Sequence, residues 1–401
     1  MSNLVNITVK SKVLLFARKT AGFSVEEVVA KLKRASIQLE TVKFWEEKDS
    51  QISLTLLREL AKYYKRPLAF FFLKKPPAES IIPAAFRTLP AEVPTEQISL
   101  SPAVRFCIRC ASRAQEITYE IGLKLQKKFK RNLPKVTLSD DPVLFARKIR
   151  NKLKLTIKEQ SQWKEPREAL KKWINLVENQ DIIVQQNSLD LQQTLRGFSL
   201  AGNAKFLPLI FLNTQDNPNG RIFTLLHEYC HLMLNESGIE IKEDAVFFNQ
   251  KIKSIEAFCN KFAAALLVPE EILAKHELVS AKKGLRNAYS EAELGQLAKY
   301  FAVSKEVIVL RLKKIGQVSQ KFYESKKKEW SQERERPGRG RKHWDSFYPN
   351  RNGGIPTALV YESYHKNLLS AAELLSKLGF KSKYFEKVEN RLAQRLSLTN
   401  D

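Results

Sequence analysis

Apolar residues in the first 74 positions recur at three- and four-residue steps, which is the period of amphipathic helices. Ser24 followed by Glu27 has the pattern of a capping box, and it marks a helix start just before Val28 and Val29. The pattern predicts a compact module of five short helices over residues 1–74. These helices are expected to begin near Val13, Ser24, Ile37, Leu54 and Pro67.

The helical pattern is lost after residue 74 and returns some thirty residues later. Residues 75–102 are rich in proline and show little periodicity, so they are predicted to form a linker. From 103 to 132 the apolar residues again recur every three or four positions, which predicts one long amphipathic helix. Shorter helices are expected near 141–153 and 166–178.

Short apolar segments bounded by polar turns come next, and they predict strands. Three strands are expected, at Asp181–Gln186, Leu195–Leu200 and Leu207–Asn213. Helical periodicity resumes near Arg221, covers about 253–268 and extends through 314. The fold class predicted for the chain is therefore mainly α with a small β-sheet (α+β), and residues 103–316 form its main domain.

The last part of the chain differs in composition. Residues 317–354 are basic and rich in Gly, Pro, Ser and Asn, so they are predicted to form a flexible tether. The run Gly338–Lys342 within it is either a solvated segment or a contact to phosphates without sequence preference. Residues 355–401 return to helical patterning and are expected to form a C-terminal helical segment.

Composition narrows the classes of partner and compartment. The formal net charge of +25 favours a polyanionic partner, although a lysine-rich soluble surface gives the same balance. The apolar runs are shorter than the roughly 20 residues that span a bilayer, and the first residues lack the features of a signal peptide. Four cysteines in 401 residues fit a reducing compartment. We therefore expect a cytoplasmic protein without a membrane partner.

The strongest chemical signal is His227-Glu228-x-x-His231 in the helix that begins near Arg221. Two histidines four residues apart lie on one helix face, where their neutral imidazoles can share a zinc ion. Glu228 can reach a water on that ion without binding the metal, and it can act as the general base. The helix is apolar nearly all round, so these polar residues are expected to be buried and bound to a partner or a metal.

A catalytic zinc also needs a third protein ligand. Glu256 is the preferred candidate because it stands at the beginning of an apolar helix, which can pack against the first helix. Asn260, four residues later on the same face, is expected to orient Glu256. The other acidic candidates lie in a polar stretch, where such residues are usually solvated: Glu236, Glu240, Glu243 and Asp244.

The four cysteines are expected to be packed thiols. Cys107 and Cys110 form an isolated C-x-x-C in an amphipathic helix, whereas a zinc ribbon needs four ligands. Cys230 and Cys259 lie on the two helices of the metal motif and are predicted to be core residues. The remaining histidines, His276, His343 and His365, are expected at the surface.

The helix with His227 and His231 and the helix with Glu256 resemble segments of the ImmA/IrrE family of metallopeptidases. The segments Arg221–Leu234 and Glu256–Pro269 are similar to that family's motif helix and third-ligand helix, and the strands with Arg196-Gly-Phe-Ser and Leu209–Asn213 occur where the family has a small sheet. The resemblance implies a zincin-like domain in which His227, His231 and Glu256 bind the metal. It also implies cleavage of a repressor in phage, mobile-element or stress-response control.

The N-terminal module resembles an Xre-type helix-turn-helix domain. Such a domain places its recognition helix in the major groove of DNA, and Gln38, Thr41 and Lys43 are the candidate base-reading residues. The segment departs from the pattern, because Lys33-Arg34-Ala35 replaces the usual turn glycine and Leu39 and Phe44 are apolar. DNA binding and a protein-interaction role therefore both remain open for this module.

The sequence predicts a zinc-dependent endopeptidase, with Mn²⁺ as an alternative metal. Its substrate is expected to be a protein, in particular an Xre-type repressor. An edge strand with Arg196, Gly197, Phe198 and Ser199 is expected to hold the peptide by strand addition. The alternative function is a DNA-binding regulator or a repressor-binding protein whose metal domain does not cleave.

Overall fold

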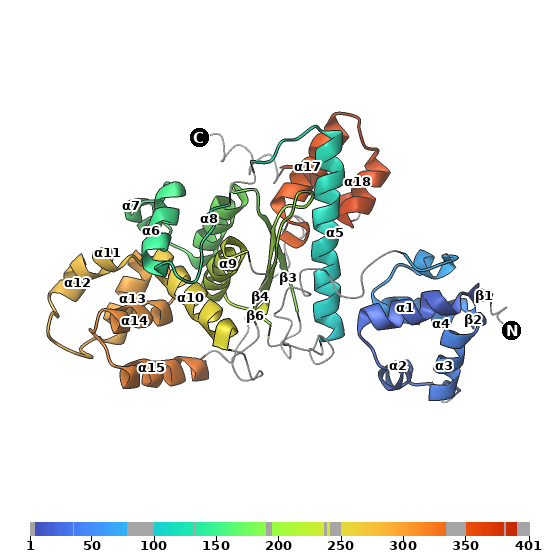
Figure 1. The fold of residues 1–401 in the computed structure, drawn as a ribbon, viewed down its shortest axis with the longest axis horizontal. Coiled ribbons are helices and arrows are strands. Elements are labelled where there is room, and N and C mark those ends of the chain that lie inside the picture. Colours follow the sequence, from blue (N-terminus) through green and yellow to red (C-terminus); the bar gives the residue numbers. More distant parts are fainter. Residues whose placement is uncertain are drawn as a thin grey trace. The chain divides into compact units, whose positions relative to one another are not determined.

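The computed structural model divides the chain into two units, residues 1–112 and 113–401. The boundary falls within helix α5 (Pro102–Lys124), shown in teal in Figure 1. The structure describes residues 5–34, 36–77, 100–130, 133–189, 195–235, 239–240, 250–333, 350–380 and 382–390. Most of the predicted linker lies outside the described residues.

The N-terminal unit contains the five predicted helices. Ser24 accepts a hydrogen bond from the backbone of Glu27, whose carboxylate accepts one from Ser24 N–H, so the capping box is confirmed. The bounds of the helices are α1 (Ser11–Ala21), α2 (Val25–Leu32), α3 (Leu39–Glu47), α4 (Leu54–Tyr64) and η1 (Leu68–Phe72). The unit also contains an antiparallel pair of four-residue strands, β1 (Asn6–Val9) and β2 (Ser50–Ser53), which was not predicted because such short strands give hardly any periodicity.

The second unit contains a four-stranded sheet in the order β3-β5-β4-β6. The three predicted strands are present as β3 (Ile183–Asn187), β4 (Gly197–Leu200) and β5 (Leu209–Asn213). β3 runs parallel to β5, and β4 runs antiparallel to it. The two-residue β6 (Ile239–Glu240) pairs with the other side of β4 at Gly197 and Phe198. The prediction that β4 is an edge strand was therefore wrong over these two residues.

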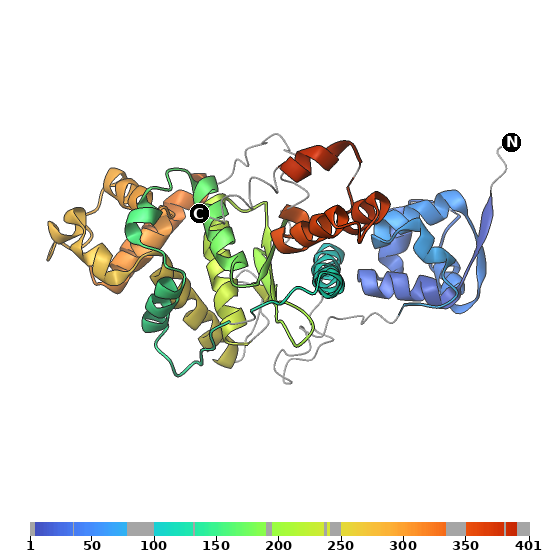
Figure 2. The same cartoon turned by 90° about the horizontal axis from the view of Figure 1, so that it is seen from above.

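Helices cover both faces of this sheet (Figures 1 and 2). α8 (Pro166–Glu178) and α9 (Pro218–Met233) pack on one face, and α10 (Gln250–Leu267) and α6 (Pro142–Lys152) pack beyond α9. α17 (Gly354–His365) contacts β3 from the other face. The other helices of the unit are α7 (Ile157–Ser161), α11 (Glu270–Lys275), α12 (Glu277–Ser280), α13 (Glu291–Tyr300), α14 (Lys305–Lys314), α15 (Gln320–Glu333), α18 (Ala371–Leu378) and η4 (Ser382–Tyr384).

Two boundaries differ from the prediction. The long helix α5 ends at Lys124 instead of residue 132, because Gln126 adopts a positive φ of 51° and Lys127 N–H bonds back to Gly122 O. The predicted tether begins with the helix α15, whose Trp330 is buried and donates its indole N–H to Glu291. The packed domain therefore extends beyond residue 316. Gly338–Lys342 lies outside the described residues.

The predicted C-terminal segment packs on the same unit. Its apolar residues Leu359, Val360 and Leu374 form a cluster with Ile117 and Ile121 of α5. The backbone N–H of Gly354 donates to the carboxylate of Glu178 at 2.9 Å, which fixes the start of α17 against α8. Among the described residues, no helix combines the length and apolar character that crossing a membrane requires.

Candidate metal centre

Helix α9 carries the two histidines and is almost completely buried. Asn217 caps its first turn by accepting a hydrogen bond from Gly220 N–H at 2.8 Å, and Pro218 occupies the first helical position. His227, Glu228 and His231 are each at most 2 % exposed. Burial of three polar side chains on one helix costs free energy unless they bind polar groups or a metal ion. Their burial therefore indicates a polar or metal-binding centre beside α9.

Three candidate ligand groups from two helices, α9 and α10, converge at one point. The Nε2 atoms of His227 and His231 lie 3.0 Å apart. The Glu256 carboxylate from α10 lies 3.1 Å from the first and 3.2 Å from the second. Ligands about 2.0–2.2 Å from a tetrahedral zinc ion are separated by roughly 3.4 Å. These three donors therefore fit a zinc ion, which would draw them only slightly apart.

The contact between Asn260 and His227 sets the tautomer of this histidine. The side-chain oxygen Oδ1 of Asn260 lies 3.0 Å from His227 Nδ1. An amide oxygen only accepts, so Nδ1 carries the proton and Nε2 presents its lone pair to the metal position. Asn260 was predicted to orient Glu256, and the structure instead places it against His227.

The electrostatics of Glu256 favour its ionised form. Burial raises the pKa of this carboxyl group, but its close contacts with the imidazoles of His227 and His231 together lower it more, and the net pKa is well below its ordinary value. Its side chain is 35 % exposed, whereas those of the two histidines are nearly inaccessible. The carboxylate therefore lies at the solvent side of the three donors.

Cys259 competes geometrically for the role of third ligand. Its sulfur and the ligand nitrogens of His227 and His231 all lie within 4.8 Å of one another. However, burial and a hydrogen bond with Cys230 raise the pKa of the Cys259 thiol well above its ordinary value. The Glu256 carboxylate lies 3.1 Å and 3.2 Å from the two imidazoles and is charged, so we favour Glu256. Both cysteines are fully buried, as predicted.

Glu228 faces the strand β4. A Cβ atom placed on Gly197 would lie 3.8 Å from Glu228 Cγ, 2.5 Å from Thr224 Cγ2 and 2.7 Å from Phe211 O. These distances leave no room for a side chain at residue 197. Gly197 is therefore the residue that lets α9, with its glutamate, lie directly against the strand.

We expect Gly197→Ala to force α9 away from β4. Overpacking of this kind typically costs about 1–3 kcal/mol of unfolding free energy, and displacement of Glu228 should lower any hydrolytic activity. Thermal unfolding and an activity assay check this expectation. The matched control is Gly295→Ala in α13, where the nearest atom lies 3.9 Å from the added Cβ. Equal effects of the two substitutions would contradict the packing argument.

The other residues predicted on this strand are mostly buried. Phe198 is inaccessible and stacks on Phe211 with ring centroids 4.8 Å apart, and Ser199 is 1 % exposed. Arg196, which precedes β4, is exposed. A peptide could therefore pair only with backbone groups of β4. At Gly197 and Phe198 the strand β6 already pairs with β4.

The residues predicted to read DNA lie on or next to α3 of the N-terminal unit. Gln38 is its N-cap residue, and Lys43 is exposed on the helix. The Thr41 hydroxyl accepts a hydrogen bond from Gln38 N–H at 3.3 Å. This bond caps the first turn of α3 and uses one acceptor site of the Thr41 side chain.

Three polar side chains that were not predicted as site residues hold the C-terminal end of α10. Arg150 donates to Leu266 O at 2.8 Å, Gln160 donates to Leu267 O at 3.0 Å, and Arg311 donates to Val268 O at 2.9 Å. These three buried side chains bind carbonyl groups that a helix end leaves without intrahelical partners. They position the helix that carries Glu256 and Asn260.

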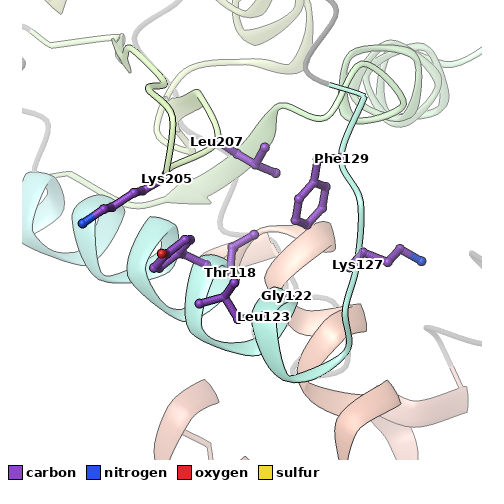
Figure 3. Close-up of a pocket in the computed structure, with 8 residues that line it drawn as sticks. Thr118, Gly122, Leu123, Lys127, Phe129, Lys205 and Leu207 are labelled. Atoms are coloured by element: carbon purple, nitrogen blue, oxygen red, sulfur yellow. The ribbon is translucent and has the colours of Figure 1, made fainter.

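Two cavities lie away from the metal centre. One of about 70 Å³ lies between α5 and the β4–β5 connection, where Lys127 and Lys205 extend from opposite sides of an apolar floor (Figure 3). A second, of about 210 Å³, adjoins the last residues of α9 and the end of β4. Neither is lined by the histidines or by Glu228, Glu256 or Asn260.

Comparison with known proteins assigns the part of the chain that contains the centre. No curated protein matches the chain. Residues 177–313 match the family model Peptidase_M78, described as an IrrE N-terminal-like domain. This range spans the sheet and the helices with His227, His231 and Glu256. Residues 177–313 therefore form a region similar to an IrrE N-terminal-like domain, which agrees with the resemblance of the motif helices to ImmA/IrrE metallopeptidases.

Proposed function

We propose that the chain is a zinc-dependent endopeptidase with His227, His231 and Glu256 as metal ligands. The observation that carries the proposal is the convergence of two imidazole Nε2 atoms and one carboxylate within 3.0–3.2 Å of one another. His₂Glu is a ligand set of catalytic zinc, which keeps a fourth position open for water or substrate. The family match adds a metallopeptidase-type function and hence a protein substrate.

The residues around the metal position then have separate roles. A zinc ion held by His227, His231 and Glu256 would supply Lewis acidity and would lower the pKa of a water molecule toward about 7. Glu228 accepts the proton of the attacking water and passes it to the leaving amine. Asn260 keeps His227 in the tautomer with a free Nε2 lone pair. Gly197 keeps the backbone of β4 close to Glu228.

The proposed substrate is a repressor of the Xre type. This part of the proposal rests on the resemblance of the motif helices to ImmA/IrrE metallopeptidases, which implies cleavage of a repressor, and on the strand β4 beside Glu228. An extended peptide would pair with the backbone of β4 and would have to take the place of β6 at Gly197 and Phe198. Binding of DNA by the N-terminal module remains a prediction.

Metal removal tests the proposed chemistry. We expect the purified chain to cleave an unfolded protein such as casein, or a co-encoded repressor, with zinc bound. Chelation should abolish cleavage, and added Zn²⁺ or Mn²⁺ should restore it. Metal content and fragment formation are measured on the same samples. Cleavage that continues at full rate in a metal-free sample would exclude the proposal.

A series of substitutions along α10 tests the ligand assignment. We expect Asn260→Ala to weaken zinc binding by about 10–100-fold, the usual cost of an outer-shell partner. Glu256→Ala should weaken it more, because one of three ligands is lost. Cys259→Ala is the matched control and should retain the wild-type affinity. A larger loss with Cys259→Ala than with Glu256→Ala would assign the third position to the thiol.

A further inference from the structure

The outward face of α3 has an unusual composition for a recognition helix. Its exposed positions Glu40, Lys43, Phe44 and Glu47 follow the three- and four-residue spacing of a single helix face. The opposite face is anchored, because Val42 is fully buried and Glu46 forms an ion pair with Arg18 of α1 at 2.6 Å. The stripe is therefore held rigidly toward the outside of the unit.

The chemistry of this stripe does not suit a polyanion. Phe44 is 51 % exposed, and the Lys48 ammonium group lies 5.8 Å from the centre of its ring. With Lys48 included, the face carries two carboxylates and two ammonium groups around one aromatic ring. An aromatic side chain surrounded by a polar rim is typical of a protein contact. A DNA contact would instead require a surplus of basic groups.

We propose that α3 is a docking surface for the α3 of a second copy of this chain. Glu40 stands four residues before Phe44, and Lys48 stands four residues after it. If two α3 helices pack antiparallel about a twofold axis at Phe44, each Glu40 faces the Lys48 of the other copy. The two Phe44 rings then cover one another at the centre. The pairing is isologous, so it closes at two copies.

The dimensions of α3 set the strength of this contact. The helix has nine residues, so it is about 14 Å long. Two such helices bury less than the roughly 1,600 Å² of a standard stable interface. The net charge of +25 also repels copies, although salt at about 0.15 M screens charges farther apart than about 8 Å. The dimer is therefore weak and reversible, and it is favoured by high concentration.

Sedimentation velocity on the full chain over a range of concentrations tests the contact. The wild-type chain is expected to shift from monomer to dimer as its concentration rises. Phe44→Ser should weaken the dimer at least about 10-fold, with an unchanged circular dichroism spectrum. Phe72→Ser is the matched control, because Phe72 is 52 % exposed on the same unit outside α3. It should leave the dimer unchanged.

A charge exchange distinguishes this packing from other modes of association. Glu40→Lys and Lys48→Glu should each weaken the dimer, and the double variant should restore it. A wild-type chain that is monomeric throughout, or a Phe44→Ser chain that associates like wild type, would overturn the proposal. So would a double variant no better than either single one. If Glu40→Lys tightened DNA binding without affecting self-association, α3 would be assigned to DNA.

Discussion

Replacement of Glu228 by glutamine is expected to lower the rate of peptide cleavage by about 10²–10⁴-fold, the usual contribution of a general acid–base group. Glutamine has nearly the same shape, so it fills the fully buried space beside Gly197 without new contacts. It has no carboxylate to accept the proton of the attacking water. Because Glu228 is not proposed as a ligand, the variant should bind as much zinc as the wild type.

This experiment separates the base from the ligands. Cleavage rate and metal content are measured for the wild type, Glu228→Gln and a control, Glu271→Gln, whose side chain is 73 % exposed on α11. The control should behave as the wild type in both assays. A Glu228→Gln chain that cleaves at the wild-type rate would refute the role of Glu228. Loss of the metal together with activity would show that Glu228 instead supports the ligands.

Replacement of Arg150 by methionine is expected to destabilise the second unit by about 2–4 kcal/mol. Arg150 is 7 % exposed, and its guanidinium donates to Leu266 O and to Gln160 Oε1. Burial lowers the pKa of Arg150 to about 10, so the side chain is still charged at neutral pH. Methionine fills much of the volume but leaves the carbonyl at the end of α10 and the Gln160 oxygen without their buried donor.

A neighbouring arginine provides the control for Arg150. Arg147 lies one turn earlier on α6, is 62 % exposed and pairs with Glu271 at 3.2 Å. An exposed ion pair contributes about 0–1 kcal/mol, so Arg147→Met should have little effect. Thermal unfolding should show the lowest midpoint for Arg150→Met, by roughly 5 °C or more. Equal midpoints for the two variants would mean that the end of α10 needs no buried donor.

The local elements and the first half of the site could be predicted from the sequence. Helix starts such as Ser24 with Glu27 depend on contacts within one turn, and the three strands of the main sheet are visible as short apolar runs. The pair His227 and His231 was likewise predictable, because the helical repeat alone brings residues four apart to one face.

The features that were missed depend on contacts between distant residues. Nothing in the local sequence distinguishes Arg150, Gln160 and Arg311 from exposed polar residues. Only the folded chain places them at the end of α10. The composition of 317–354 predicted a tether, yet residues 320–333 form helix α15, and Trp330 of this helix is buried in the core. Tertiary packing outweighs weak local preferences in such segments.

The sequence by itself therefore determined the helix with two imidazoles and a carboxylate, because one helical turn fixes that arrangement. Only the tertiary structure decided that Glu256 reaches both imidazoles, that Asn260 contacts His227 and that Gly197 admits Glu228 against the strand. These relations depend on how α10 and β4 pack on α9, and such packing is set by side chains far apart in the chain.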